Sequence, residues 1–187
     1  MKIDRSDILD QALGILDDYG LADLTMRRLA DALGVKPGAI YWHYENKQTL
    51  LAAVSDAILE GVGEPSSGDW RSDLRVWAGS LRAHLLEHRD AADVVSSTRA
   101  AGLGHLDPAS TPAAILVTAG WGEERAGRAS RALVHLVLGH VVEEQSRLQL
   151  IELGVLPAPA VALDDEGFRE GVDMLLDGMK DHLAVAN

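Results

Sequence analysis

Apolar residues recur along this chain with the spacing of amphipathic α-helices. Leu9, Leu13 and Leu16 share one face of the first such segment. That segment predicts a helix over residues 6–19, with Ser6 as its N-cap. The later segments repeat the three- and four-residue spacing, and none keeps the two-residue alternation of a β-strand. The pattern therefore predicts an all-α fold.

Two short helices are expected next, separated by only a few residues. Thr25 is expected to cap the first, and Gly34 supplies the positive φ that ends it. Pro37 suits the first turn of the second helix, which is expected to reach Tyr44. Two short helices joined by a tight turn with glycine are typical of a helix-turn-helix, whose second helix enters the major groove of DNA.

The second short helix carries a cluster of ring side chains in a chain with only 4% Phe, Trp and Tyr. Tyr41 and His43 have polar tips and are expected to face outward, toward phosphates or a thymine methyl group. Trp42 is expected to pack inward against the first helix. Gly38 and Ala39 are small enough for the backbone to approach DNA closely. Ordinary core aromatics of a helical bundle are the alternative, which four adjacent ring residues fit poorly.

The rest of the chain predicts further helices separated by segments rich in turn residues. Asn46 is expected to cap a helix that ends near Gly61, and "GEPSSGD" is the clearest linker. Helices are then expected over residues 70–88, 91–100, 111–120, 123–149 and 166–183.

Composition narrows the classes of protein that the chain can belong to. There is no cysteine, which excludes disulfides, thiolate metal sites and cysteine nucleophiles. No stretch approaches the roughly 18 uncharged apolar residues of a membrane span, and the N-terminus lacks the apolar run of a signal peptide. A cytoplasmic protein without a membrane partner is therefore expected.

The net charge of −12, taken alone, argues against a nucleic-acid partner. The charge is unevenly spread, however. The window from Thr25 to Lys47 holds four bases and two acids and is therefore net +2. A DNA-binding protein needs a local basic surface, which the global charge does not exclude.

Enzymatic functions have weaker support. His84 and His88 have a spacing that can place two imidazoles on one metal ion. There is no H-E-x-x-H motif and no third ligand at a defined spacing, so two exposed helix histidines are the preferred interpretation. Nucleophile-elbow and phosphate-loop motifs are also absent. We expect no enzyme, metal ion or cofactor; a helical interaction module without DNA binding is the remaining alternative.

The stretch "LTMRRLADALGVKPGAIYWHYENKQTLL" resembles the DNA-binding domain of the tetracycline-repressor (TetR) family of bacterial transcriptional regulators, with similarity from Ile8 to about Leu59. The resemblance implies a helix-turn-helix domain over residues 1–47 and a helical ligand-binding and dimerisation domain over residues 48–187. It implies DNA contacts at Thr25, Arg27, Lys36, Gly38, Ala39, Tyr41, His43 and Lys47.

Two later segments resemble the C-terminal part of the same repressors. "HRDAADVVSSTR" is similar to the segment before their ligand pocket, and "LVHLVLGHVVEEQSR" to their long dimerisation helix. This implies a homodimer through helices 123–149 and 166–183, paired as a four-helix bundle, and a pseudo-palindromic DNA operator. It also implies a repressor that a small-molecule effector releases from DNA.

The expected effector-binding residues are mostly apolar, with His135 on the same stripe. They are Trp77, Leu81, Leu85, Val95, Thr98, Arg99, Leu103, Ile115, Leu116, Trp121, Val134, His135 and Leu138. Positions that hold the drug and its Mg²⁺ in tetracycline repressors fall here on Gly63, Trp77, Leu81 and Val95, although Thr98, Arg99 and Glu143 match. Because imidazole and amide groups are missing there, a flatter and more apolar effector than Mg²⁺–tetracycline is expected.

Overall fold

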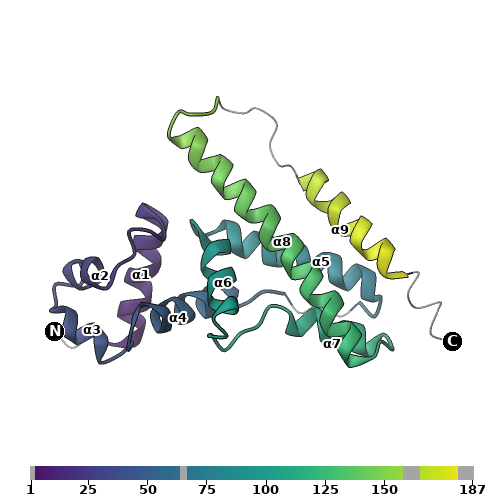
Figure 1. The fold of residues 1–187 in the computed structure, drawn as a ribbon, viewed down its shortest axis with the longest axis horizontal. Coiled ribbons are helices and arrows are strands. Elements are labelled where there is room, and N and C mark those ends of the chain that lie inside the picture. Colours follow the sequence, from purple (N-terminus) through teal and green to yellow (C-terminus); the bar gives the residue numbers. More distant parts are fainter. Residues whose placement is uncertain (1–2, 64–66, 158–164, 181–187) are drawn as a thin grey trace. The chain divides into compact units, whose positions relative to one another are not determined.

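The computed structural model describes residues 3–63, 67–157 and 165–180, and all regular secondary structure in these ranges is helical, which confirms the all-α prediction. The helices are α1 (Arg5–Tyr19), α2 (Met26–Ala32), α3 (Pro37–Tyr41), α4 (Lys47–Leu59), α5 (Trp70–Leu86), α6 (Ala91–Ala100), α7 (Ser110–Thr118), α8 (Glu123–Glu152) and α9 (Asp165–Lys180) (Figure 1).

The chain divides into two compact units. The first unit comprises Met1–Glu60 and His84–Asp107, and the second comprises Gly61–Ala83 and Pro108–Asn187. Helix α5 contributes residues to both. The boundary expected after residue 47, between the DNA-binding domain and the ligand-binding and dimerisation domain, stays a prediction.

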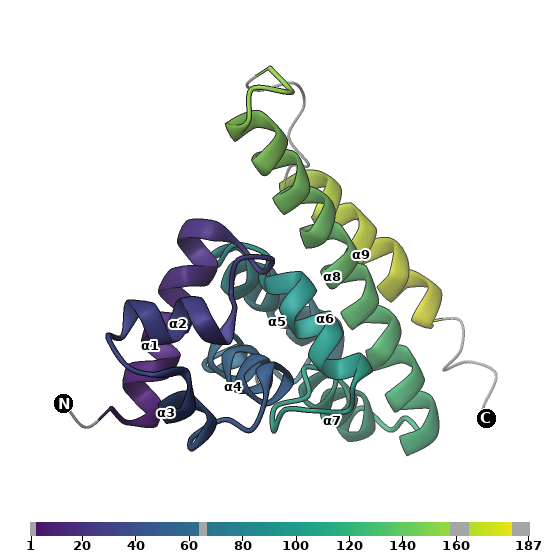
Figure 2. The same ribbon diagram turned by 60° about the vertical axis from the view of Figure 1, so that its left-hand side comes forward.

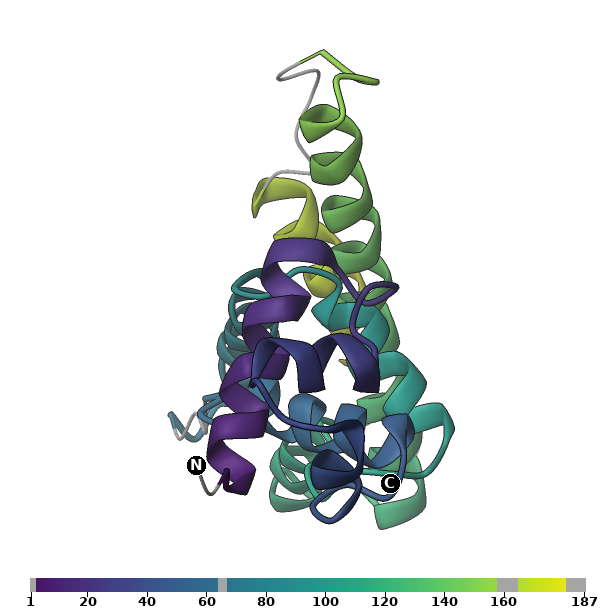
Figure 3. The ribbon, with the colours of Figure 1, turned by 90° about the vertical axis from the view of Figure 1, so that its left-hand side faces the viewer.

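In the first unit, α1, α2 and α3 pack around a small apolar core (Figures 1 and 3). Ile8 and Leu16 of α1, Leu29 of α2 and Ile40 of α3 are completely buried. Burying side chains of this size is worth about 1.5–3 kcal/mol each. This core holds the two short helices, which could not persist alone at such lengths.

The N-terminal caps of α2 and α4 confirm the sequence prediction. Thr25 Oγ1 accepts a hydrogen bond from the backbone N–H of Arg28 at 3.1 Å. Asn46 Oδ1 accepts one from the backbone N–H of Thr49 at 2.9 Å. Each cap satisfies a donor that would otherwise lack a partner in the first helical turn.

The predicted N-cap of α1, Ser6, is wrong. The cap is Asp4, whose Oδ1 accepts the backbone N–H of Asp7 at 3.0 Å. In return, Asp7 Oδ2 accepts the backbone N–H of Asp4 at 3.0 Å. This reciprocal capping box satisfies two donors, whereas a helix starting after Ser6 would leave it unformed.

Several later helices differ from their expected bounds by a few residues. Helix α8 continues to Glu152, and α7 spans Ser110–Thr118. Helix α5 ends at Leu86, so His88 lies beyond it. Helix α9 begins at Asp165, and its expected end at residue 183 lies outside the described residues. None of the helices in the described ranges is long and apolar enough to cross a membrane.

In the second unit, α8 and α9 lie side by side (Figures 1 and 2). Val137 and Val141 of α8 and Phe168 and Leu176 of α9 are buried. Helix α7 also packs on α8.

Arg82 of α5 joins α8 and α9 within the second unit. Its Nε and Nη2 donate to Glu144 at 3.1 and 2.9 Å, and its Nη1 donates to Asp165 at 2.5 Å. Burial opposes the charge of Arg82, but the two carboxylates outweigh it and raise the Arg82 pKa. The hydrogen bond from Arg82 lowers the pKa of the Asp165 carboxyl.

Candidate functional site

The turn between α2 and α3 has the geometry that its sequence predicts. Gly34 has φ +65°, which confirms the positive φ expected there. The backbone N–H of Val35 donates to the carbonyl of Ala30 at 3.0 Å and closes the turn. Lys36 is extended, with ψ 144°, and Pro37 occupies the first turn of α3. Helix α3 thus starts immediately after the turn, with its first residues at the surface.

Helix α3 is shorter than expected, and a different ring from the one predicted faces inward. Trp42 is 90% exposed, so the prediction that it packs against α1 is wrong. Tyr44 takes the buried position, with 7% exposed, because it lies one helical turn after the buried Ile40 and its backbone N–H donates to the Ile40 carbonyl at 3.0 Å. Burial raises the pKa of Tyr44, and the charge of Arg5 opposes that shift. Tyr41 is 50% exposed, as expected of an outward-facing residue.

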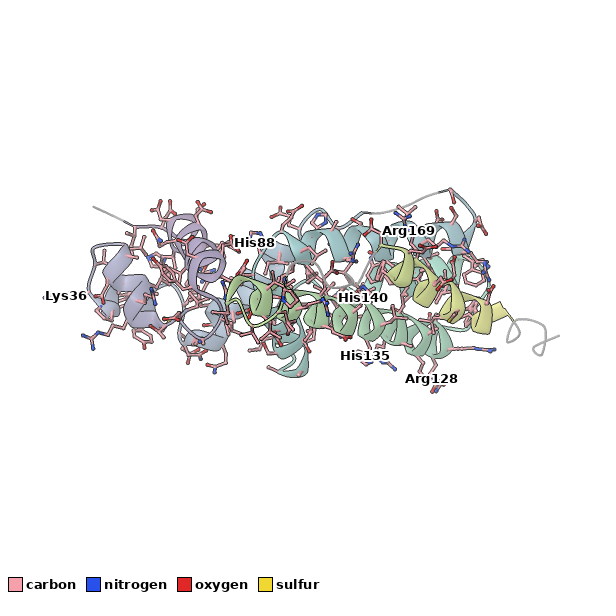
Figure 4. All side chains as sticks on the ribbon, turned by 90° about the horizontal axis from the view of Figure 1, so that it is seen from above. Lys36, His88, Arg128, His135, His140 and Arg169 are labelled. Carbon is pink, nitrogen blue, oxygen red and sulfur yellow. The ribbon has the colours of Figure 1, made fainter. Side chains whose placement is uncertain are left out.

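The eight expected DNA-contact residues all lie in the first unit, on or beside α2, α3 and the start of α4. Thr25, Arg27 and Lys36 are exposed, and Figure 4 shows Lys36 at the edge of the unit. Gly38 and Tyr41 are exposed as well, and the remaining three, Ala39, His43 and Lys47, are half-buried. The structure therefore brings these residues together, while their contacts with DNA remain a prediction.

Two neighbouring cations are held by the protein itself. Arg28 hydrogen-bonds Asp23, and its guanidinium lies 3.8 Å from the centre of the Tyr19 ring. Lys47 is partly engaged, because its Nζ donates to the carbonyl of Leu21 at 3.3 Å. Arg27 and Lys36 are therefore the more accessible charges.

A contact that sequence reasoning missed joins α1 to the segment after α3. Arg5 Nη2 donates to the backbone carbonyl of His43 at 3.1 Å, and its guanidinium lies 5.5 Å from the centre of the Tyr44 ring. Arg5 and the segment from Tyr41 to Glu45 also line a groove of about 650 Å³ in the first unit. Residues this far apart in the chain leave no periodic signal in the sequence.

The expected effector-binding residues divide between the two units. Leu85, Val95, Thr98, Arg99 and Leu103 lie in the first, and Trp77, Leu81, Ile115, Leu116, Trp121, Val134, His135 and Leu138 lie in the second. Most are buried, as the core of a helical domain also requires. Their convergence on one effector pocket stays a prediction.

Two of these residues are more exposed than expected. His135 does not lie on the buried stripe of α8, because Val134 and Val137 on either side take the inward positions. Figure 4 shows His135 and Arg128 along the same outer edge of α8. Leu103 is 38% exposed because it lies in the loop after α6 rather than on the helix.

The histidine pair considered as a metal site has a different environment. His88 lies after α5, and its Nδ1 is 3.0 Å from Asp17 Oδ2. His84 and His88 are both half-buried, so the prediction of two exposed helix histidines is wrong. Among the described residues, no three or more His, Cys, Asp or Glu side chains are grouped to hold a metal ion.

Comparison with known families gives two matches. Residues 8–54 match the family described as "Bacterial regulatory proteins, tetR family". Residues 62–154 match the "Tetracyclin repressor-like, C-terminal domain". Together these matches span most of the chain, including α2, α3 and the whole of α8.

Individual relatives extend the similarity over the full length. The class A tetracycline repressor of transposon 1721 from Escherichia coli is 32% identical over 206 residues, covering 100% of this chain and 95% of the relative. The crystal structure of BioQ from Mycobacterium smegmatis is 39% identical, with a TM-score of 0.87 over 96% of this chain and 99% of that one. A BioQ structure with its natural double-stranded DNA operator is 38% identical, with a TM-score of 0.80 over 94% and 97% of the two chains.

Proposed function

The chain belongs to the tetR family of bacterial regulatory proteins, and from this premise we propose that it is a repressor that a small, largely apolar effector releases from a pseudo-palindromic operator. One observation carries the DNA-binding part of this proposal. A five-residue α3 with an accessible Lys36 before it and an exposed Tyr41 at its end follows α2 after a glycine turn. This is the geometry of a recognition helix.

In this proposal, α3 enters the major groove with its N-terminal end toward the base edges. Gly38 and Ala39 allow the backbone to come close, and Tyr41 reaches a phosphate or a thymine methyl group. Arg27 and Lys36 bind the phosphate backbone. The relative determined with its natural DNA operator supports this interpretation by its similarity over nearly the whole chain.

In this proposal, homodimerisation through α8 and α9 provides a second DNA-binding surface, the α2–α3 helix-turn-helix of the other protomer. The outer edge of α8 carries Ala132, His135, Gly139 and Ser146, all exposed in the single chain. Ala132, Gly139 and Ser146 are small, which allows a second helix to approach this edge closely. A two-fold dimer places two α3 helices on successive turns of DNA, which accounts for a pseudo-palindromic site.

We place the effector among the buried apolar residues of α5, α7 and α8 in the second unit. The buried Trp77 favours a flat, apolar molecule over a metal-chelated drug. The indole N–H of Trp121 is buried and has no hydrogen-bond partner among the described residues. Buried donors are rarely left unpaired, so an effector with a hydrogen-bond acceptor would suit this position. We propose no catalytic activity for this protein, and we propose that it is cytoplasmic.

The DNA contacts proposed for the helix-turn-helix can be tested with substituted proteins. Their binding is measured to a DNA fragment that the purified, unchanged protein enriches from the host genome. Tyr41→Ala and Lys47→Ala should each weaken binding, whereas Val76→Ala should leave it close to that of the unchanged protein. Val76, on α5 in the second unit, is the control, since it is 56% exposed and Tyr41 is 50% exposed. Circular dichroism checks that every variant keeps its helices. Binding that neither Tyr41→Ala nor Lys47→Ala alters would favour the alternative, a helical interaction protein that does not use this surface for DNA.

A further inference from the structure

The turn between α7 and α8 holds a buried donor that lacks an acceptor. Trp121 is 6% exposed, and its indole N–H has no hydrogen-bond partner among the described residues. The backbone at this point is fixed, because the N–H of Trp121 donates to the carbonyl of Leu116 at 3.0 Å. A buried donor without an acceptor has lost its water and gained nothing in return. The indole therefore favours a molecule that brings an acceptor to it.

A guanidinium beside this indole lacks an ionic partner as well. Arg125, in the first turn of α8, is half-buried, and its Cζ lies 4.9 Å from the centre of the Trp121 ring. No carboxylate in the described part of the chain pairs with it, and Glu124 of the same turn is held by Arg128 at 2.5 Å. A half-buried cation without a counter-charge favours an anion. Trp121 and Arg125 thus present two unused donors close to each other.

Arg71 shows that contact with an indole does not exclude an ionic partner. Its Cζ lies 5.6 Å from the centre of the Trp70 ring, so Arg71 and Arg125 have similar aromatic contacts. Arg71 nevertheless donates to the carbonyl of Leu176 at 3.1 Å and to Asp177 at 2.5 Å. The missing acceptor at Arg125 is therefore the difference between the two arginines, and a ligand can supply it.

The surroundings of these donors suit a flat ring. Trp70, at the start of α5, lies edge-on to Trp121, with 6.1 Å between the ring centres and an interplanar angle of 63°. Trp70 is only half-buried, so part of its ring is open to another molecule. Gly120 and Gly122 flank Trp121, and a Cβ at either position would meet nothing within 4 Å. An aromatic group thus has a ring to pack against and open space beside the donors.

The start of α8 adds a preference for negative charge. Its N-cap, Gly122, has no side chain that could accept the N–H groups of the first turn. The positive end of the helix dipole also lies at this turn. This effect supports the two side-chain donors and points to the same kind of ligand, an anion.

We propose that Trp121 and Arg125 together bind the carboxylate of an aromatic-acid effector. The planar guanidinium matches a carboxylate, and the indole N–H donates to one of its oxygens. Arg125 lies against the indole ring and has to turn aside as the carboxylate enters, which its long side chain allows. This inference rests on the proposed function for its consequence, release of the operator. The binding of an aromatic carboxylate does not depend on it.

The first test observes the indole N–H groups of the full-length protein by NMR, without DNA. The chain has four tryptophans, and the signal lost in Trp121→Phe identifies Trp121. Benzoate, 2-naphthoate and anthracene-9-carboxylate are the probes, added to millimolar concentration. At least one should shift the Trp121 signal, because its N–H gains a charged acceptor. The signal of Trp42, which is 90% exposed in the first unit, should stay in place. A Trp121 signal that none of the three probes moves would overturn the proposal.

The second test compares the carboxylate that binds with its neutral primary amide by calorimetry. The unchanged protein should bind the carboxylate at least about tenfold more tightly than the amide. Arg125→Met keeps an unbranched apolar side chain and should reduce this preference to less than about threefold. Arg75→Ala is the control, since it removes an arginine of α5 that Asp173 already pairs, and it should keep the full preference. Equal affinities in the unchanged protein, or a full preference in Arg125→Met, would contradict the assignment.

The third test uses the enriched genomic fragment. The carboxylate probe should release the unchanged protein from this fragment and leave Arg125→Met bound at the same concentration. Equal release of both proteins would overturn the role of Arg125, and binding without release would overturn the assignment of this site to the effector. Absence of any fragment bound by the unchanged protein would instead count against the proposed function. The NMR and calorimetric tests would still decide whether Trp121 and Arg125 bind a carboxylate.

Discussion

Substitution of Lys36 by alanine tests the electrostatic basis of the proposed DNA contact. Lys36 is exposed immediately before α3, and Arg27 is exposed on α2. Lys47 is half-buried at the start of α4, with its Nζ 3.3 Å from the Leu21 carbonyl. Arg28 is not counted among the cations that can bind phosphates, because Asp23 and the Tyr19 ring already hold its guanidinium. Each protomer therefore offers three cations to the phosphate backbone.

These cations set the expected salt dependence of the affinity. A dimer that binds phosphates with three cations per protomer makes about six contacts, so the logarithm of the binding constant should fall with the logarithm of salt with a slope of about −5.4. Lys36→Ala removes one contact per protomer and should reduce the slope to about −3.6. Between 50 and 200 mM salt, the affinity of the unchanged protein should then fall about 2,000-fold and that of the variant about 150-fold.

Fluorescence anisotropy of the labelled fragment at five or six salt concentrations measures both slopes. Arg75→Ala is the matched control, since it removes one exposed, ion-paired cation from α5 in the second unit, a helix outside the proposed dimer surface of α8 and α9. The control should lower the slope by much less than Lys36→Ala. Equal slopes for Lys36→Ala and the unchanged protein would refute the assignment of a phosphate contact to Lys36. A slope near zero for the unchanged protein would refute the electrostatic account altogether.

Three further predictions concern the fold that supports the site. Thr25→Ala should lower the free energy of unfolding by about 1 kcal/mol in urea titrations, because it removes the α2 cap; an unchanged midpoint would show that the cap is dispensable. Tyr44→Ala should cost about 3 kcal/mol and Trp42→Ala less than about 0.5 kcal/mol, reflecting their burial and exposure; the reverse order would restore Trp42 to the core. Because Arg82 lowers the pKa of Asp165, that carboxylate stabilises the fold above its unfolded-state pKa, and the contribution is lost as the pH falls through its lower folded-state pKa. The thermal midpoint of Asp165→Asn should therefore fall less steeply between pH 5 and 3 than that of the unchanged protein, and parallel curves would contradict this.

Helix existence and capping were predictable because they depend on neighbouring residues. Thr25 and Asn46 each lie immediately before an apolar periodic segment, and each is the observed cap. Gly34 was identified as the positive-φ residue for the same local reason. At α1 the predicted cap, Ser6, was wrong, because the reciprocal hydrogen bonds between Asp4 and Asp7 start the helix at Arg5.

Side-chain direction near the end of α3 was less predictable. Trp42 was expected to pack inward, but it is 90% exposed, and Tyr44 is the buried ring with 7% exposed. Tyr44 follows the buried Ile40 by one helical turn, so of the four adjacent rings it is the one that shares the inward face of Ile40. The same problem affects His135, which lies between two inward-facing valines on α8. Such single-residue directions depend on the tertiary packing that a one-dimensional pattern does not contain.

Contacts between distant segments had no sequence signal at all. The carboxylate of Asp56 accepts a hydrogen bond from the backbone N–H of His105, 49 residues further along the chain. Arg5 and His43 are 38 residues apart. Neither contact belongs to a motif, and in each case a backbone group, which has no residue identity, is one of the partners. The hydrogen bonds between Asp56 of α4 and the loop after α6 could therefore be found only in the structure.

Selection of genomic fragments from the host by the purified dimer is the most direct test of the central claim, that this chain binds a specific DNA operator. The account predicts enrichment of a pseudo-palindrome whose two half-sites lie about one helical turn apart. It also predicts that binding to the enriched fragment weakens as salt rises. A folded dimer that enriches no sequence, both as purified and after denaturation and refolding to remove any bound effector, would contradict the claim.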